Sequence, residues 1–200
     1  MSYIDEFVES MRFAAKLSGK NIGVTHEFET LSHYYRDVSK NQDMAEFVRE
    51  TILQAAKTFV RNTPYGVADQ CHSISQQFFE RCRDIGLTDY CGLAITVGNI
   101  EYKGKEVYPT SREHVASALE DGFSPDKPLD LHVWITTVNM FVIDLTVIPT
   151  LIGKGLAKPK DFKGSDVVVA KNGVKKTLRY RPILHDDEFM YKVDRIAGLA

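Results

Sequence analysis

The sequence predicts an α+β fold in which helices from the N-terminal part pack on an antiparallel sheet. Apolar residues recur at helical spacing through most of the first 85 positions, whereas short runs rich in Val, Ile and Thr follow one another after position 90. Helices followed by sequential strands are typical of α+β domains, whereas helices that alternate with strands would indicate a parallel sheet. A length of 200 residues suits one domain with a substantial core.

Four segments carry apolar residues at helical spacing: 2–18, 27–38, 43–60 and 69–85. The third has the broadest apolar face, and Asp43 can cap its start. In the fourth, Asp69 is the expected N-cap and Gly86 the expected C-cap, because glycine readily takes the left-handed conformation that ends helices. The first part of the chain, residues 1–61, is therefore expected to be helical.

Five later segments are predicted to be strands: 90–100, 131–137, 140–147, 167–170 and 174–180. Asn172-Gly173 lies between the last two and is a good hairpin signal. Residues 101–130 are polar and resemble an insertion with one short helix near Ser111, and residues 148–165 are expected to form a loop. A final helix is predicted over 184–196, so that a hairpin and a helix make up the last part, 148–200.

Composition and charge exclude several classes of function. The formal charge of −2 gives no electrostatic reason to expect nucleic acid as a partner. No apolar run approaches the roughly 20 residues that span a bilayer, so no membrane association is expected. The first residues have neither a basic start nor a continuous apolar region, which predicts a cytoplasmic protein. A protein exported without a cleaved signal would have the same appearance.

The three cysteines, Cys71, Cys82 and Cys91, do not suggest a disulfide framework, because their number is odd. On one helix Cys71 and Cys82 would lie about 16 Å apart along the axis, and a disulfide needs Cα atoms within about 7 Å. A zinc site built from these cysteines with His72 and His132 lacks the usual ligand spacing. We therefore expect neither a metal nor an organic cofactor.

Cys71 falls in the first turn of a predicted helix. Free backbone N–H groups and the positive end of the helix dipole favour a thiolate there. The same N–H groups could hold the oxyanion of a tetrahedral intermediate. The carboxylate of Asp69 would repel a thiolate unless it turns to cap the backbone. The alternative is that Cys71 is a small buried apolar residue, as most intracellular cysteines are.

His132 and Asp144 lie on two strands that a tight turn joins. If the turn is Thr137-Val138-Asn139, with Asn139 left-handed, His132 lies directly opposite Asp144 on the same face. The carboxylate could then fix the imidazole tautomer and leave the other ring nitrogen for a thiol. A two-residue turn would instead move Asp144 to the other face. The alternative is a structural pair, because a charge in an apolar run is costly unless it is paired.

These residues resemble a known superfamily. His132-Val133-Trp134, followed by Ile143-Asp144-Leu145-Thr146 and preceded by a cysteine at a helix start, is similar to the transglutaminase-like and papain-like cysteine enzymes. The resemblance covers residues 62–147. It implies a papain-like or transglutaminase-like core with Cys71 as nucleophile, His132 as general base and later acid, and Asp144 as the residue that orients His132.

The resemblance implies a cysteine-dependent hydrolase that cleaves an amide or related acyl bond through an acyl-thioenzyme, as a thiol protease or amidase does. The substrate would be a peptide, a protein or a small amide. Two alternatives stay open. One is a transglutaminase-like acyltransferase with an amine acceptor, and the other is a catalytically inactive binding module of the same fold.

Four further residues are candidates for substrate binding. Tyr65 and Gln70 are candidates for the oxyanion hole, because the upstream glutamine that papain-like enzymes use for this purpose has no counterpart here. His72 would point about 100° away from Cys71 on a helix, which makes it a poor base for that thiol but a possible substrate contact. Trp134 shares the face of His132 and could either cover the site or belong to the core.

Overall fold

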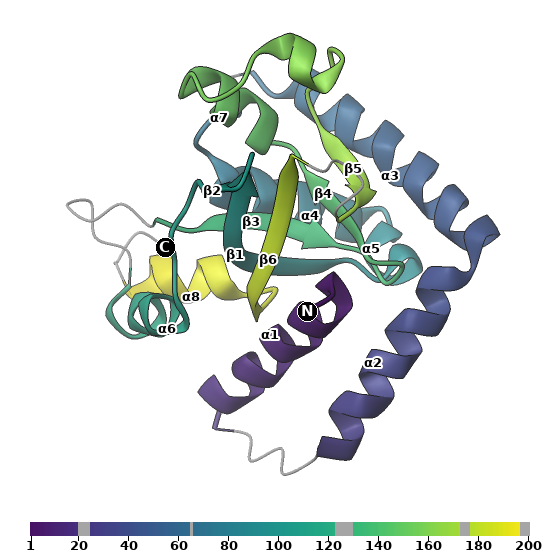
Figure 1. Cartoon of the computed structure of the whole chain (residues 1–200), viewed down its shortest axis with the longest axis vertical. Coiled ribbons are helices and arrows are strands. Elements are labelled where there is room, and N and C mark those ends of the chain that lie inside the picture. Colours follow the sequence, from purple (N-terminus) through teal and green to yellow (C-terminus); the bar gives the residue numbers. More distant parts are fainter. Residues whose placement is uncertain (20–24, 65, 123–129, 173–176, 197–200) are drawn as a thin grey trace.

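A computed structural model of the chain describes residues 1–19, 25–64, 66–122, 130–172 and 177–196 (Figure 1). Its helices are α1 (Tyr3–Leu17), α2 (Thr25–Lys40), α3 (Gln42–Asn62), α4 (Cys71–Asp84), α5 (Leu87–Cys91), α6 (Arg112–Asp121), α7 (Val147–Gly153) and α8 (Phe189–Ile196), with a 3₁₀ turn η1 (Pro159–Phe162). Its strands are β1 (Ala94–Tyr102), β2 (Lys105–Glu106), β3 (His132–Thr136), β4 (Phe141–Asp144), β5 (Val168–Lys171) and β6 (Leu178–His185). The predicted α+β class is confirmed.

The strands form one curled antiparallel sheet around β1 (Figure 1). The order is β2-β1-β3-β4-β5, and β6 pairs with the other edge of β1. Gly98 of β1 shows this arrangement, because it lies opposite His132 of β3 on one side and Pro182 of β6 on the other. β1, the longest strand, therefore pairs with β3, the strand that begins at His132, and β3 lies inside the sheet.

Two buried clusters cover the two faces of this sheet. Alternate residues such as Val133 and Ile135 of β3 pack with α3, α4 and α8 in the larger cluster. Trp134, between them in sequence, points to the other face and packs with α7 and η1 in the second cluster. The period of two that β-strands impose thus separates the two clusters. His132 shares the parity of Trp134 and belongs to the second face.

The four predicted N-terminal helices are present, but the expected caps of two are wrong. Asn41, not Asp43, caps α3, because its Oδ1 accepts from the N–H of Met44 at 3.1 Å. Gln70, not Asp69, occupies the N-cap position of α4. Gly86 follows the end of α4 in the left-handed conformation (φ 75°), so this part of the prediction is confirmed.

Several predicted boundaries in the second half are wrong. Cys91 ends helix α5 instead of lying in a strand, because Gly92 takes a left-handed conformation (φ 54°) and β1 begins only at Ala94. The expected loop 148–165 contains most of α7 and the η1 turn, and the expected insertion 101–130 contains the end of β1, β2 and α6. Residue 184 lies in β6, and the last helix begins at Phe189. The predicted hairpin of the last two strands is not seen among the described residues, because β5 pairs with β4 and β6 pairs with β1. Gly173 itself lies outside the described residues.

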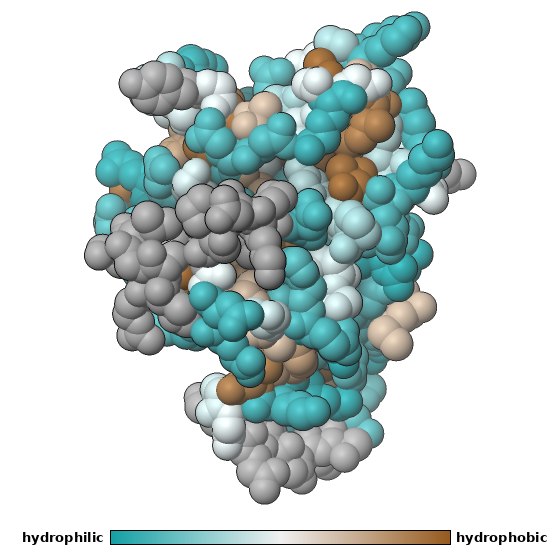
Figure 2. Space-filling view, turned by 90° about the vertical axis from the view of Figure 1, so that its left-hand side faces the viewer, coloured by the Kyte–Doolittle hydropathy of each residue, from teal (hydrophilic) through white to brown (hydrophobic). Residues whose placement is uncertain are grey.

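Hydrophilic side chains cover most of the described part of the face on which α6, α7 and α8 lie (Figure 2). Hydrophobic side chains appear there only in small separate areas. Among the described residues, no helix is both long enough and apolar enough to cross a membrane.

Candidate active site

Cys71 is the first residue of α4 and lies against the start of β3. Its side chain is buried, with the residue 3% exposed, and Sγ lies 3.8 Å from the carbonyl oxygen of Leu131. The preceding Gln70 makes no side-chain cap, because its Nε2 donates to the carbonyl of Gly66 at 2.8 Å. No capping side chain from Gln70 therefore blocks the N–H groups in the first turn of α4.

Asp69 does not cap α4, contrary to the prediction. Its backbone is left-handed (φ 56°), and its N–H donates to the hydroxyl of Thr150 on α7 at 2.8 Å. Its carboxylate lies 3.2 Å from Nζ of Lys154. This ammonium offsets the negative charge that would otherwise act on the neighbouring thiol.

The β3–β4 hairpin brings His132 and Asp144 together, although the predicted turn is wrong. The loop is Val138 to Met140, and Met140 rather than Asn139 is left-handed (φ 61°). Thr136 pairs with Val142, so the register differs by two residues from the prediction. A shift of two keeps every side chain on its face, and His132 reaches Asp144 diagonally, with Nε2 2.6 Å from Oδ2.

The reason for the different turn is a tertiary contact. The side chain of Asn139 is buried, and its Nδ2 donates to the carbonyl oxygen of Val38 in α2 at 3.1 Å. Turn propensity alone favours asparagine at the left-handed position, but this contact fixes Asn139 one residue earlier in the loop.

Asp144 is fully buried and accepts hydrogen bonds at both oxygens. Oδ1 accepts from the N–H and hydroxyl of Thr146, at 2.9 and 3.1 Å, and from the N–H of Val147 at 2.9 Å. Oδ2 accepts from the hydroxyl of Tyr180 at 3.0 Å besides contacting His132. Burial raises the pKa of Asp144, but His132 and these N–H groups outweigh it, so the pKa lies below its usual value.

His132 and Cys71 favour each other's charged form. Burial lowers the pKa of His132, but the negative charges of Asp144 and Cys71 raise it to about 10. Burial likewise raises the pKa of Cys71, but the charge of His132, followed by hydrogen bonding that includes His72, lowers it to about 6. The arrangement therefore favours a thiolate–imidazolium pair at neutral pH.

Nδ1 is the ring nitrogen of His132 that remains for the thiol, because Nε2 contacts Asp144. Nδ1 is buried, and no described residue forms a hydrogen bond of good geometry with it. Its interaction with Cys71 therefore depends on charge more than on an aligned hydrogen bond. Hydrogen bonds of this kind are often long without substrate and tighten in the complex.

Two aromatic rings pack against the imidazole of His132. The ring of Tyr108 stacks on His132 with centroids 5.2 Å apart, and that of Trp134 lies 6.2 Å away on nearly parallel planes. The hydroxyl of Tyr108 lies 3.4 Å from Oδ1 of Asp69, and Nζ of Lys154 lies 5.5 Å from the Tyr108 ring centroid. These ring contacts, together with the contact to Asp144, limit reorientation of the imidazole.

The other predicted site residues have different positions. Trp134 is fully buried and donates Nε1 to the hydroxyl of Tyr3 at 2.9 Å, so it presents no surface to a substrate. His72 is partly exposed and contributes to the low pKa of Cys71. Gln70 is exposed beside Cys71, with its amide group directed to Gly66. Tyr65 lies outside the described residues.

Sequence reasoning missed Tyr108, Tyr180 and Lys154. Tyr108 and Lys154 lie in segments that were expected to be an insertion and a loop, and no spacing links them to Cys71. Alternation along β6 places Tyr180 on the buried side with Leu178, which the sequence could have indicated, but not its contact with Asp144. Of the described residues, no group of three or more His, Cys, Asp or Glu could hold a metal ion, and the three cysteines are free thiols.

Comparison of this chain with protein-family models, with curated proteins and with solved structures finds no match.

Proposed function

We propose that this protein is a cysteine-dependent hydrolase that cleaves an amide or related acyl bond through an acyl-thioenzyme, on a papain-like or transglutaminase-like core. One observation carries the proposal. Within the described residues, α4, β3 and β4 bring together the thiol of Cys71, the imidazole of His132 and the carboxylate of Asp144. The pKa of the thiol is lowered to about 6. The carboxylate is fully buried and accepts hydrogen bonds from four donors besides His132. The motif resemblance of Cys71, His132 and Asp144 supports the same assignment.

The reaction follows from the charges of these groups. The Cys71 thiolate attacks the substrate carbonyl carbon and forms a C–S bond, and N–H groups in the first turn of α4 stabilise the oxyanion. The imidazolium of His132 donates its proton from Nδ1 to the leaving amine as the C–N bond breaks. Neutral His132 then takes a proton from water, whose oxygen attacks the thioester. Breakage of the C–S bond releases the acid and regenerates the thiolate, and Asp144 holds the ring throughout.

A second candidate function is an inactive binding module of the same fold. The 3% exposure of Cys71 favours it, because a substrate carbonyl must reach Sγ. Selective reactivity of the thiol would separate the two functions.

The test is alkylation with iodoacetamide near pH 6, followed by mass spectrometry of each cysteine. Modification of Cys71 well before Cys82 and Cys91, lost in His132→Ala, is the result expected for the hydrolase. Equal and slow labelling of all three thiols would contradict it and favour the inactive module. Release of p-nitrophenol from p-nitrophenyl acetate, with and without an added amine, then distinguishes hydrolysis from acyl transfer by the product formed.

A further inference from the structure

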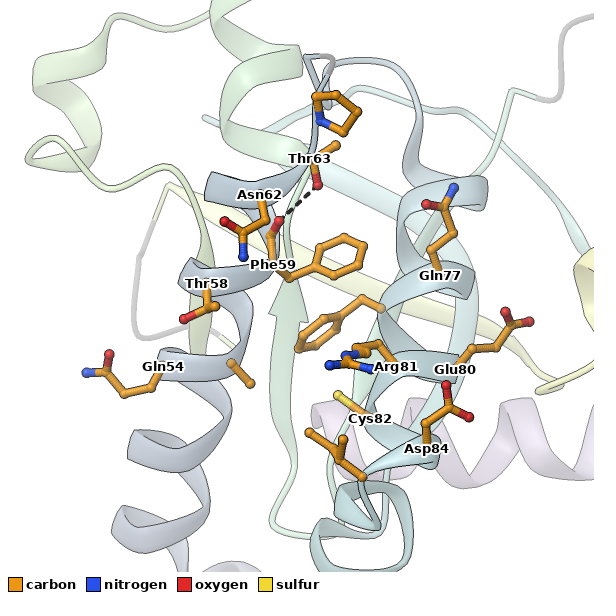
Figure 3. A pocket seen from close by; sticks show the side chains of 14 residues that line it. Gln54, Thr58, Phe59, Asn62, Thr63, Gln77, Glu80, Arg81, Cys82 and Asp84 are labelled. Atoms are coloured by element: carbon orange, nitrogen blue, oxygen red, sulfur yellow. Dashed lines mark hydrogen bonds between the residues drawn. The ribbon is translucent and has the colours of Figure 1, made fainter.

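Two surface hollows away from the proposed active site differ in their charge. The larger one, of about 710 Å³, lies between α3 and α4, and the carboxylates of Glu80 and Asp84 line it together with Arg81 (Figure 3). Its charge therefore favours no class of ligand. The smaller one, of about 480 Å³, lies between the C-terminal part of α3 and residues 163–167, which lead into β5 beside that helix (Figure 1). None of the three proposed catalytic residues lines it.

The smaller hollow is basic. Lys57 and Arg61 line it from α3, where a spacing of four residues places them on one face of the helix. Lys163 lines it from the facing segment. Among its described lining residues Asp166 is the one carboxylate, so three cations and one anion leave a net charge of +2. Across the part of the chain that the structure describes, none of these four side chains forms an ion pair.

The helix dipole accounts for only one of the three cations. Basic side chains are favourable in the last turn of a helix, because its final carbonyl groups carry a partial negative charge. Arg61 lies in the last turn of α3, but Lys57 precedes that turn and Lys163 belongs to another segment. An anion placed between the two walls would be attracted by all three side chains.

Both walls of this hollow are anchored to the core. Val167 is 4% exposed and belongs to the larger buried cluster, on which Val60 of α3 also packs. The segment that carries Lys163 is closed by its own hydrogen bonds. The N–H of Ser165 donates to the carbonyl of Phe162 at 3.0 Å, and the hydroxyl of Ser165 donates to the carbonyl of Val167 at 2.7 Å. The backbone that carries the cations is therefore ordered before a ligand binds, which lowers the cost of binding.

The charge and the volume narrow the class of ligand. A phosphate monoester carries about −1.5 to −2 charges at pH 7 and three strong acceptor oxygens, which match a net charge of +2 and three donor side chains. A carboxylate or a phosphodiester carries only one negative charge. A volume of about 480 Å³ lies in the range of small-molecule sites and leaves space for an organic part beside the phosphate. Asp166 would repel a second anionic group but can accept hydrogen bonds from hydroxyl groups.

From the three unpaired cations, their position on two ordered walls and the volume between them, we infer that this hollow binds a small phosphate monoester that carries hydroxyl groups. The phosphate pairs with Lys57, Arg61 and Lys163, and the hydroxyl groups of the ligand donate to Asp166. This site is independent of the proposed hydrolase activity, because the two share no residue.

Calorimetric titration of the full chain with glycerol 3-phosphate, at low ionic strength, tests the inference. Saturable binding is expected, and Arg61→Gln and Lys163→Gln should each weaken it about fivefold through loss of a charged hydrogen bond. Lys160→Gln is the matched control, because Lys160 is exposed three positions before Lys163 and does not line the hollow. Asp166→Asn should bind about threefold more tightly, because it removes a charge that repels the phosphate.

Related ligands test which part of the monoester is recognised. Dimethyl phosphate should bind about tenfold more weakly than glycerol 3-phosphate, because it carries one negative charge and no hydroxyl group. Inorganic phosphate should also bind more weakly, because it lacks the organic part. Circular dichroism confirms that each variant is folded, and Cys71→Ala should bind glycerol 3-phosphate as the unmodified protein does.

Several results would overturn the inference. Glycerol 3-phosphate might show no saturable binding, inorganic phosphate or dimethyl phosphate could bind as tightly as it does, or Lys163→Gln and Lys160→Gln could behave alike. Binding of a phosphoserine peptide about tenfold more tightly than glycerol 3-phosphate would also overturn it, because the ligand would then be a protein rather than a small molecule.

Discussion

The hydroxyl of Tyr180 donates to Oδ2 of Asp144 at 3.0 Å, so one carboxylate oxygen serves both this phenol and the imidazole of His132. Tyr180 comes from β6, which pairs with β1, whereas Asp144 comes from β4 on the other side of β3. The contact therefore extends from one part of the curled sheet to another. Burial, with the negative charge of Asp144, raises the pKa of Tyr180, which keeps the phenol protonated as a donor.

Tyr180→Phe should destabilise the fold by about 2 kcal/mol, because it removes a buried hydrogen bond to a charged group. The ring contact with Trp134, at 5.2 Å between centroids, should persist in the variant. Urea unfolding measures the change. Tyr34→Phe is the control, since Tyr34 is 52% exposed, and its stability should stay within about 0.5 kcal/mol of the unmodified protein. Equal stability of the two variants would argue against a structural role for the Tyr180 hydroxyl.

The thiolate of Cys71 should be visible in a pH titration. Absorbance at 240 nm is expected to rise with a midpoint near pH 6, because the charge of His132 lowers the pKa of this buried thiol to about 6. In His132→Ala the burial that raises the pKa dominates, so the midpoint should move above the usual range near 8.5. Cys82→Ala should leave the first midpoint unchanged, because the pKa of that thiol is raised to about 12. A wild-type midpoint above pH 8 would contradict the proposed ion pair.

The sequence predicted the three residues of this site but not the geometry that joins them. Side chains alternate between the two faces of a strand, and this alternation along β3 and β4 was sufficient to place His132 and Asp144 on one face. The prediction survives the two-residue difference in strand register, because a shift of two residues leaves every side chain on its face. The turn itself depends on Asn139 contacting α2, more than 100 positions away in the chain, which no local pattern contains. Tyr108 and Lys154 reach the site by the same kind of long-range packing.

Asp144 should make the protein lose stability in acid. The pKa of this carboxyl is lower in the folded protein than its usual value, so its stabilising contribution is fully present above about pH 4 and is lost as the pH falls through the folded pKa. Asp144→Asn should be less stable than the unmodified protein at pH 7, and the difference should shrink below pH 4. Urea unfolding at a series of pH values measures both curves. Asp37→Asn is the control, because its side chain is 76% exposed, and it should keep the acid dependence of the unmodified protein. A difference that stays constant down to pH 2 would contradict this assignment.

Gly98 should be required for the packing beside His132. A Cβ added there would lie 2.1 Å from the carbonyl oxygen of Arg181 and 2.8 Å from the Trp134 ring, and neither the β6 backbone nor the buried indole can move freely. Gly98→Ala should therefore cost about 1–3 kcal/mol or more and lower the melting temperature by several degrees. It should also change the near-ultraviolet circular dichroism of the single tryptophan. Gly153→Ala is a matched control at the end of α7, where an added Cβ meets no atom within 4 Å. Alanine there should be neutral or slightly stabilising, because glycine is the poorer helix former. If both substitutions leave the melting temperature and the tryptophan signal unchanged, the Trp134 ring does not pack against Gly98 of β1 as described.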